Sequence, residues 1–213
     1  DNGHFILSYE EKEKILAKFP DAKKYIKKYI GAQEFIKGIQ RWCLWVEDRD
    51  LESIKKFDLI DERIKKVKEF RLRSRSKSTK KAAERAHKFI GIQHPPDSAL
   101  IIPCVSSGER NYIPVGFVDT SYVINNNAHA IYNPDIFIFS FVSSKMHMAW
   151  VNVVSGRMRS DFNYSSSFCY NPFPIPKIDI QIKKNLEKLA FEIIDIREKF
   201  PDLTIAQLYN NET

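Results

Sequence analysis

Cysteine is scarce in this sequence, and the few cysteines are poorly placed for two kinds of stabilising site. The 213 residues contain three cysteines, without a CxxC pair and without a histidine at metal-ligand spacing. An odd number of distant cysteines argues against both a disulfide framework and a zinc site. We therefore expect a reducing compartment, the cytoplasm. The three cysteines are Cys43, Cys104 and Cys169.

Long hydrophobic runs are missing as well. The longest uncharged apolar run, Ile136 to Ser144, is about half as long as a membrane-spanning helix requires, and no signal peptide is visible. We expect a soluble protein without membrane contact. Hydrophobic residues make up 43% of the chain, which suffices for the core of one domain or of one domain with an appendage. The sequence opens "DNGHFILS", without methionine, and we expect it to be part of a longer polypeptide.

Positive charge, in contrast, is abundant and concentrated. The chain has 34 Lys and Arg against 27 Asp and Glu, net +7, whereas the window from Asp61 to Lys88 alone has 12 against 4, net +8. At its centre lies "FRLRSRSKSTKK", residues 70–81, called the basic arm below. Such a concentration favours phosphate binding, although a solvated charge run and, more weakly, a nuclear localisation signal are alternatives. The residues expected to contact phosphates are Arg71, Arg73, Arg75, Lys77, Lys80 and Lys81.

The first ninety residues are predicted to be mostly helical. Ser8 and Glu11 form a capping box, which predicts a helix from about residue 9. A buried strand is predicted from Ile39 to Val46. The other helices are expected at 22–30, capped by Asp21 and ended by Gly31, at 51–57, at 60–71, and at about 78–89, capped by Ser78 or Thr79.

The following residues change to short strands and then return to helix. Asn133 and Pro134 predict the start of a helix that is apolar almost all round, ends at Gly156 and forms the buried centre. A long helix is predicted from Ile178 to Phe200. The predicted fold class is therefore α+β, with short, mostly antiparallel strands around a buried central helix, flanked by helices and followed by a long C-terminal helix. The strands are expected at Leu100–Val105, Tyr112–Val118, Tyr122–Ile124 and Ala128–Tyr132.

Four blocks of sequence, taken in order, resemble a known family. They are "GAQEFIKGIQRWCLWV", "IPCVSSGERNYIPVGF", "VSSKMHMAWVNVVSGRMRSDFNYSSSFCYNPFPIP" and "FPDLTIAQLY". The chain is similar over nearly its whole length to the C-terminal part of MmeI-like Type IIL restriction-modification enzymes and related DNA methyltransferases. Several long blocks are far more specific than one short motif. Two departures stand out: Gly108 interrupts the usual "SSER" run, and Cys104 occupies a position where the family generally has arginine.

The resemblance implies a function for this piece of the parent protein. It would be the DNA target recognition domain, residues 1–175, followed by a helical C-terminal or spacer segment, residues 176–213. The parent would be a bacterial or archaeal adenine methyltransferase that uses S-adenosylmethionine. An endonuclease domain in the same polypeptide is also implied by the family, and whether this parent cleaves DNA stays open. No glycine-rich cofactor turn, "NPPY" motif or nuclease motif is visible, so the fragment alone is expected to be non-catalytic, without cofactor or metal. Its partners would be double-stranded DNA and the methyltransferase domain of the same polypeptide.

Base recognition requires amide, guanidinium and carboxylate groups held against a groove, and three polar loops supply them. They are called the first loop (106–111), the second loop (125–127) and the third loop (157–167). The third is the preferred candidate, since both charge signs alternate there with amides and hydroxyls beside the predicted buried helix. Ordinary polar turns are the alternative, above all for the asparagines. The candidate readout residues are Ser107, Glu109, Arg110, Asn125, Asn127, Arg157, Arg159, Asp161, Asn163, Tyr164 and Ser166.

Two polar residues interrupt the apolar pattern of the predicted central helix. His147 is most simply a core histidine satisfied by a neighbour, and Lys145 is expected to contact a phosphate. The three tryptophans are expected in the core. A competing interpretation makes the chain a protein-interaction or structural module that uses the long C-terminal helix, with the basic arm merely solvated. The tryptophans are Trp42, Trp45 and Trp150.

Overall fold

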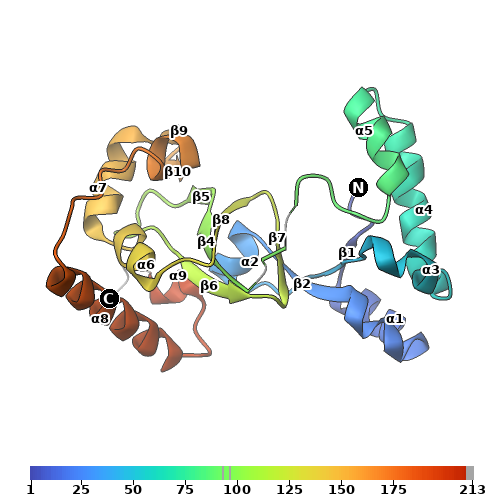
Figure 1. The fold of residues 1–213 in the computed structure, drawn as a ribbon, viewed down its shortest axis with the longest axis horizontal. Helices are drawn as coiled ribbons and strands as arrows, with labels where there is room; N and C mark the ends of the chain where they lie inside the picture. The colour runs from blue at the N-terminus through green and yellow to red at the C-terminus, as the bar shows by residue number, and fades with distance from the viewer. Residues whose placement is uncertain (93, 96, 210–213) are drawn as a thin grey trace. The chain divides into compact units, whose positions relative to one another are not determined.

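The computed structural model describes residues 1–92, 94–95 and 97–209. The chain forms two compact units, and each contains sheet and helices (Figure 1). Each unit also has its own cluster of buried hydrophobic residues. Both units are discontinuous in sequence. Most of the predicted strand Tyr122–Ile124 belongs to unit 1, and the helix Ala32–Lys37 belongs to unit 2. Unit 1 comprises Asp1–Tyr29, Gln40–Gln93 and Ser121–Val123, and unit 2 comprises Ile30–Ile39, His94–Thr120 and Ile124–Thr213.

Unit 1 is built on a sheet whose strands run in the order β1-β3-β2-β7. Strand β3 pairs antiparallel with both β1 and β2, and Cys43 lies opposite Ile6 on one side and Lys27 on the other. Cys43 and Val123 are fully buried and pack with Tyr29. The strands are β1 (Ile6–Leu7), β2 (Ile26–Ile30), β3 (Trp42–Leu44) and β7 (Tyr122–Ile124).

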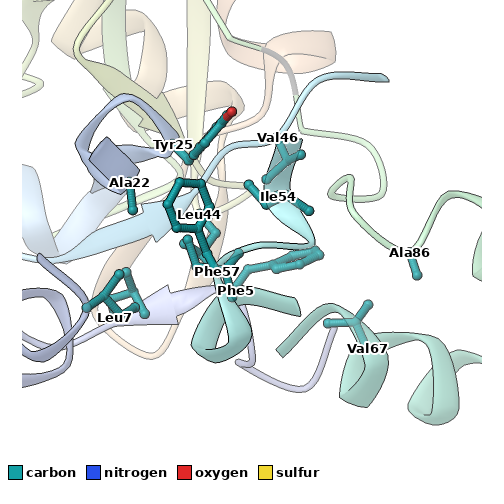
Figure 2. Packing of buried hydrophobic residues seen from close by; sticks show 12 residues of the cluster. Phe5, Leu7, Ala22, Tyr25, Leu44, Val46, Ile54, Phe57, Val67 and Ala86 are labelled. Carbon is teal, nitrogen blue, oxygen red and sulfur yellow. The ribbon is translucent and has the colours of Figure 1, made fainter. Parts of the chain in front are cut away.

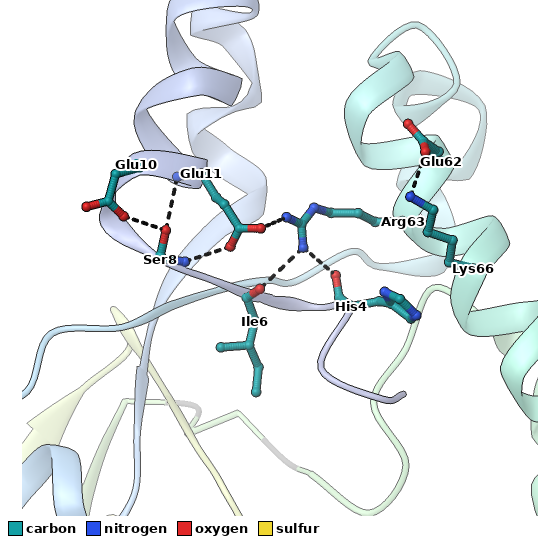
Figure 3. A network of polar contacts seen from close by, with 8 residues as sticks. All are labelled: His4, Ile6, Ser8, Glu10, Glu11, Glu62, Arg63 and Lys66. Atoms are coloured by element: carbon teal, nitrogen blue, oxygen red, sulfur yellow. Dashed lines mark hydrogen bonds and ion pairs between the residues drawn. The ribbon is translucent and has the colours of Figure 1, made fainter.

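Helices complete unit 1. The capping box before α1 is confirmed: the Glu11 backbone N–H donates to the Ser8 hydroxyl at 3.2 Å, and the Ser8 N–H donates to the Glu11 carboxylate at 2.9 Å (Figure 3). The helical elements are α1 (Tyr9–Lys18), the 3₁₀ turns η1 (Pro20–Tyr25) and η2 (Asp48–Asp50), α3 (Leu51–Ile54), α4 (Asp58–Leu72), α5 (Lys77–Lys81) and the 3₁₀ turn η3 (Ala82–Arg85).

The helix predicted at 22–30 is wrong, because this segment forms η1 and then strand β2. Pro20 stands at the start of the 3₁₀ turn, and the backbone turns into the sheet at Ile26. Trp45 and Tyr29 then donate backbone hydrogen bonds across the ladder, to Tyr25 and Arg41, both at 2.8 Å. Pairing with β3 thus overrides the local helix pattern, as tertiary context commonly does.

Smaller corrections concern the ends of elements. Helix α3 ends at Ile54, and Phe57 already precedes α4. The helix that restarts within the basic arm, α5, is capped by Ser76, whose hydroxyl accepts from the Thr79 N–H at 3.4 Å, and not by Ser78 or Thr79. The predicted strand at 39–46 is confined to β3.

The core of unit 1 is mainly aliphatic and aromatic (Figure 2). Phe57 makes edge-to-face contacts with Phe19, at a ring-centroid distance of 5.4 Å, and with Tyr25, at 5.8 Å. Val67 of α4 and Ala86, just after η3, belong to the same buried cluster. The segment after the basic arm is therefore anchored in this core.

Unit 2 contains two three-stranded sheets, in the orders β6-β4-β8 and β5-β10-β9. The pairings of β4 with β6 and β8, and of β10 with β5 and β9, are antiparallel. The predicted strand at 112–118 begins only at Gly116, and the predicted 100–105 strand divides into β4 and β5. The strands are β4 (Ser98–Pro103), β5 (Val105–Ser106), β6 (Gly116–Asp119), β8 (Ala128–Tyr132), β9 (Gly156–Met158) and β10 (Asp161–Asn163).

The predicted central helix is two helices in the structure. The hydroxyls of Ser143 and Ser144 donate to the carbonyls of Phe139 and Phe141, at 2.6 and 2.7 Å, and close the first helix. Ser144 then caps the second by accepting from the His147 N–H at 3.0 Å. The helices of unit 2 are α2 (Ala32–Lys37), α6 (Ile136–Val142), α7 (Lys145–Val154), the π-helical turn η4 (Ser166–Tyr170), α8 (Ile180–Glu198) and α9 (Ile205–Leu208).

Helix α7 is also less buried than expected. Its Val153 side chain is 84% exposed and Met146 is 54% exposed, whereas Val151 is fully buried. The first helix starts at Asp135, which accepts from the Phe137 N–H at 3.0 Å, and not at Asn133. Among the described residues no single helix is long and apolar enough to cross a membrane; only α6 and α7 together reach that length, bent by 57°.

The predicted fold class is confirmed at the level of short antiparallel strands combined with helices. Helix α8 packs against α6 within unit 2, where Ala190 is buried and Lys183 pairs with Asp135 at 2.9 Å. Its bounds are two residues inside the predicted ones at each end. The separation of residues 176–213 as a spacer segment stays a prediction.

Candidate nucleic-acid interface

The first and third loops are brought together by the sheet β5-β10-β9. Ser106 lies opposite Phe162, and Phe162 lies opposite Arg157 on its other side. The first loop therefore leaves β5 beside the hairpin that carries the third loop. Two segments that are fifty residues apart in the sequence are neighbours in unit 2.

Gly108 permits the close approach of these loops. A Cβ atom at Gly108 would overlap the backbone carbonyl oxygen of Ser160 and would also lie 3.2 Å from an Nη atom of Arg157. A backbone atom at a strand turn cannot move aside as a flexible side chain can. The glycine that interrupts the "SSER" run is therefore required by the packing of the first loop on the third.

Cys104 connects the second loop to the other two. Its backbone N–H donates to the Asn127 carbonyl at 3.0 Å, and its carbonyl accepts from the Tyr164 N–H at 2.8 Å. Cys104 itself stands between β4 and β5, immediately before the first loop. All three loops are thus held around one backbone position in unit 2.

The candidate readout residues differ in how far they reach solvent. The exposed ones are Glu109, Asn127, Arg157, Arg159 and Asn163. The half-buried ones are Ser107, Arg110, Asp161 and Ser166. Burial lowers the pKa of Arg110, and the nearby Asp161 carboxylate opposes that shift.

Asn125 is buried and supports the loop rather than projecting from it. Its side-chain oxygen accepts from the Asn127 N–H at 2.9 Å, and its backbone N–H donates to the Ile30 carbonyl at 2.8 Å. A Cβ atom on Gly31 would overlap the Asn125 amide, so the two residues are in tight contact. Base readout by Asn125 stays a prediction, but the residue is only 4% exposed and its side chain is used in the turn, which is the alternative role.

Tyr164 is also buried, and its hydroxyl lies 3.0 Å from Nε2 of His147. The prediction that His147 is a core histidine is confirmed, and its Nε2 is satisfied by Tyr164, whereas its Nδ1 has no partner among the described residues. Base contact by Tyr164 stays a prediction, and the burial of its side chain argues against it. Desolvation lowers the pKa of His147 to about 4 and raises the pKa of Tyr164 above its usual range. Both groups are neutral in the folded protein at pH 7.

The two arginines of the β9–β10 hairpin have different environments. Arg157 donates to the Asn152 side chain at 2.5 Å and to the Ser160 carbonyl at 3.2 Å, and its guanidinium lies 3.9 Å from the Phe162 ring centroid. Arg159 stands in the two-residue turn with φ of 59°, and its side chain has no partner among the residues that the structure describes. Arg159 is thus available to a ligand, while Arg157 is partly used within the protein.

The basic arm carries exposed cations on α5 and on the turn before it. Arg73 is 3.9 Å from Glu69, the longest of the helix pairs, and such exposed pairs contribute little. The other exposed cations of the arm make no ion pair within the described ranges. They are Arg75, Lys77, Lys80 and Lys81.

Arg71 does not belong to that exposed set, and its burial argues against the predicted phosphate contact, which stays a prediction. Its side chain is 1% exposed, and its guanidinium donates to three backbone carbonyls that follow the arm. The sequence held a signal for this burial: Arg71 follows Val67 by four residues, on the face of α4 that also carries Ile60 and Ile64.

The remaining predicted residues are Lys145, which is exposed, and the three tryptophans, which are half-buried. Lys145 is exposed at the first turn of α7, with its ammonium 6.0 Å from the Tyr112 ring centroid. The tryptophans are half-buried at the edges of the cores, and the Trp150 indole N–H donates to the Cys169 carbonyl at 3.1 Å. The expectation of core tryptophans therefore holds in part.

A depression of about 470 Å³ in unit 1 lies outside the predicted residues. It is lined by His4, Lys14, Glu62 and others, and by Arg63 and Glu11, which pair with each other (Figure 3). Both charge signs are present and mostly paired. Among residues 1–92, 94–95 and 97–209, no group of three or more His, Cys, Asp or Glu side chains is arranged to bind a metal ion.

Clustered polar loops on short antiparallel strands, together with a segment of exposed cations, are typical of the class of nucleic-acid recognition domains. The family model for the MmeI target recognition domain matches residues 1–177. The chain therefore belongs to the MmeI target recognition domain family, which confirms the resemblance found in the four sequence blocks.

Two relatives extend over the whole chain. DNA methyltransferase A of Bacillus subtilis (strain 168) is 38% identical over 213 residues, which are 100% of this chain and 24% of that protein. The solved structure of the Type IIL restriction-modification enzyme MmeI in complex with DNA has a TM-score of 0.95 and 38% identity, covering 100% of this chain and 28% of that one. The chain spans about a quarter of the length of these relatives.

Proposed function

We propose that this chain recognises a specific sequence in double-stranded DNA on behalf of a larger DNA-modifying enzyme. The observation that carries the proposal is the likeness, at a TM-score of 0.95 and 38% identity, to an enzyme whose structure is of a complex with DNA. The clustering of the three polar loops in unit 2 and the exposed cations in unit 1 support it independently.

The two jobs of recognition fall to different groups. Phosphate contact is assigned to the exposed cations of the arm and of α7, because flexible charged stems neutralise phosphates without reading sequence. Base readout is assigned to the loop residues that reach solvent, because amides, guanidinium and carboxylates can pair with base edges. The phosphate set is Arg73, Arg75, Lys77, Lys80, Lys81 and Lys145. The readout set is Ser107, Glu109, Arg110, Asn127, Arg157, Arg159, Asp161, Asn163 and Ser166.

For the parent protein we propose an adenine-specific DNA methyltransferase of a bacterium or archaeon, acting in the cytoplasm. Support comes from the 38% identity to a protein named DNA methyltransferase A. S-adenosylmethionine would bind in the methyltransferase domain, outside these 213 residues. An endonuclease domain in the same polypeptide would cleave DNA, as the resemblance to restriction-modification enzymes implies.

A salt titration tests the proposal. The 213-residue chain is titrated with random duplex DNA between about 50 and 200 mM salt, where phosphate binding gives a steep linear fall of log K against log salt. Absence of binding at the lowest salt would count against the proposal. Exchange of the third loop in the full-length enzyme for that of a relative should change the methylated sequence; an unchanged sequence would remove the loop from readout.

A second candidate function uses the exposed apolar side of α8. Ile182, Leu189 and Ile196 recur every seven residues, and they are 46%, 54% and 54% exposed. Such a stripe fits a partner helix in another domain. Its affinity would be nearly indifferent to salt, so the same titration separates it from phosphate binding.

A further inference from the structure

The inference concerns Arg71, a buried arginine at the C-terminal end of α4. One Nη atom donates to the carbonyls of Ala82 and Arg85, both at 2.9 Å, and the other donates to the Lys88 carbonyl at 2.6 Å. The guanidinium therefore spans the whole of η3 and the turn after it. These carbonyls belong to the start of η3, its last residue and the turn after it, and the Arg85 carbonyl also accepts from the Lys88 N–H at 3.1 Å.

The basic arm lies between the two ends that Arg71 joins. The chain leaves α4 after Leu72, passes through α5, where the arm ends, and then runs alongside α4 as η3 (Figure 1). The returning segment is also anchored by Ala83 and Ala86, which are buried, and by His87, whose Nε2 is 2.8 Å from Asp48. The exposed cations of the arm are thus carried on a short excursion that is closed at its base.

A closed base matters for phosphate binding. Five long cationic side chains on a mobile loop would lose backbone and side-chain freedom on binding, and that loss opposes affinity. A loop whose two ends are already fixed loses less conformational freedom on binding. Only a planar guanidinium can serve three carbonyls in this way, since a lysine ammonium is a single point donor on a flexible stem.

We infer that Arg71 is a positioning residue for DNA binding: it holds both ends of the basic arm together so that Arg73, Arg75, Lys77, Lys80 and Lys81 meet the phosphate backbone as one preformed set. The inference rests on the proposed function. It assigns to Arg71 no contact with DNA.

The test compares Arg71→Lys with Arg63→Lys in the 213-residue chain. Arg63 is a matched control, because it also lies on α4 and donates to two backbone carbonyls, those of His4 at 3.0 Å and Ile6 at 3.3 Å (Figure 3). These carbonyls belong to the N-terminal segment and not to the residues that follow the arm. Both variants keep the positive charge. Binding to random duplex DNA is measured across salt concentrations, and hydrogen exchange is measured for residues 72–88.

Arg71→Lys is expected to weaken binding about tenfold, to make the salt dependence shallower and to speed exchange in residues 72–88, because fewer cations of the arm reach phosphates together. Arg63→Lys is expected to lower stability without these effects. In a chain whose five exposed arm cations are replaced by glutamine, Arg71→Lys should change affinity by less than about twofold, since its effect acts through those cations.

Three outcomes overturn the inference. If Arg71→Lys binds with the affinity and salt dependence of the natural chain, Arg71 does not position the arm. If exchange in residues 72–88 is unchanged, the arm is not clamped by Arg71. If Arg63→Lys weakens binding equally, the effect is general destabilisation. Failure of the natural chain to bind any duplex would instead overturn the proposed function, and this inference with it.

Discussion

The two units of the molecule differ sharply in charge. Unit 1 contains 23 Lys and Arg against 14 Asp and Glu, net +9, whereas unit 2 contains 11 against 13, net −2. The polar loops proposed to read bases thus belong to a unit with almost no electrostatic attraction for DNA of its own. Under the proposed roles, attraction to the DNA backbone comes mainly from unit 1, with Lys145 of unit 2 added, and discrimination between bases comes from unit 2, so each is expected to be alterable without the other.

The units also use buried polar groups differently. In unit 1, Arg71 is charged and joins backbone segments on either side of the basic arm. In unit 2, His147 and Tyr164 are neutral and hold α7 beside the end of β10. Unit 1 thus has a buried charge beside its exposed cations, and unit 2 has a buried neutral pair beside its polar loops.

The largest expected effect comes from neutralising the arm, which would break the contrast in charge. Replacing the five exposed arm cations by glutamine should weaken binding to every duplex on the order of a thousandfold at low salt and reduce the salt slope by about four to five. The matched control replaces five exposed lysines of unit 2, which should change binding far less; equal losses would refute the division between units. The control lysines are Lys37, Lys177, Lys184, Lys188 and Lys199.

A second effect concerns the neutral pair in unit 2. Because burial lowers the pKa of His147 from 6.5 to about 4, the unfolded chain binds a proton between these pH values and the folded chain does not. The free energy of unfolding should therefore fall as the pH drops from about 6.5 to about 4, by on the order of 3 kcal/mol for this group, and be fully present at pH 7. Urea unfolding followed at several pH values measures it.

The control for that measurement is His147→Gln, which keeps a polar partner for Tyr164 and does not titrate. Its unfolding free energy should lose this part of the pH dependence. The same slope in both proteins would show that other groups cause it.

The third effect tests how the loops of unit 2 are held together. Gly108→Ala should lower stability by about 2 kcal/mol and relax sequence preference, because the added Cβ would displace the Ser160 carbonyl. Gly156→Ala, on the same sheet, is the control, since its nearest neighbour would be 3.9 Å away and an ordinary contact. Thermal unfolding and binding to the preferred site give both readouts. A stable Gly108→Ala chain with unchanged preference would contradict the tight packing.

The smallest effect separates the two arginines of the β9–β10 hairpin. Arg159→Ala should cost about 1 kcal/mol on the preferred site, relax one base position and leave the salt slope nearly unchanged. Arg157→Ala should in addition lower stability, since Arg157 contacts Asn152, Ser160 and Phe162 within the protein. Selection from a random duplex pool measures the preference. A uniform loss over all sequences would mean that Arg159 contacts phosphate.

The sequence by itself determined the features that depend on neighbours along the chain. These features are the Ser8 cap, the strands Tyr122–Ile124 and Ala128–Tyr132, and the exposure of most of the basic arm, and they follow from local hydrogen bonding, turn residues and charge. The motif blocks likewise placed the chain in its family, which the family match over residues 1–177 confirms.

Only the tertiary structure decided what distant segments do to each other. Residues 26–30 form a strand because they pair with β3, and Arg71 is buried because two carbonyls of η3 and the carbonyl of Lys88 accept its hydrogen bonds. Asn125 is buried in contact with Gly31, and Tyr164 is buried with its hydroxyl beside His147. The first loop lies against the third loop at Gly108. Each of these outcomes depends on a partner tens of residues away or on the far side of a turn, and a local pattern carries no record of it.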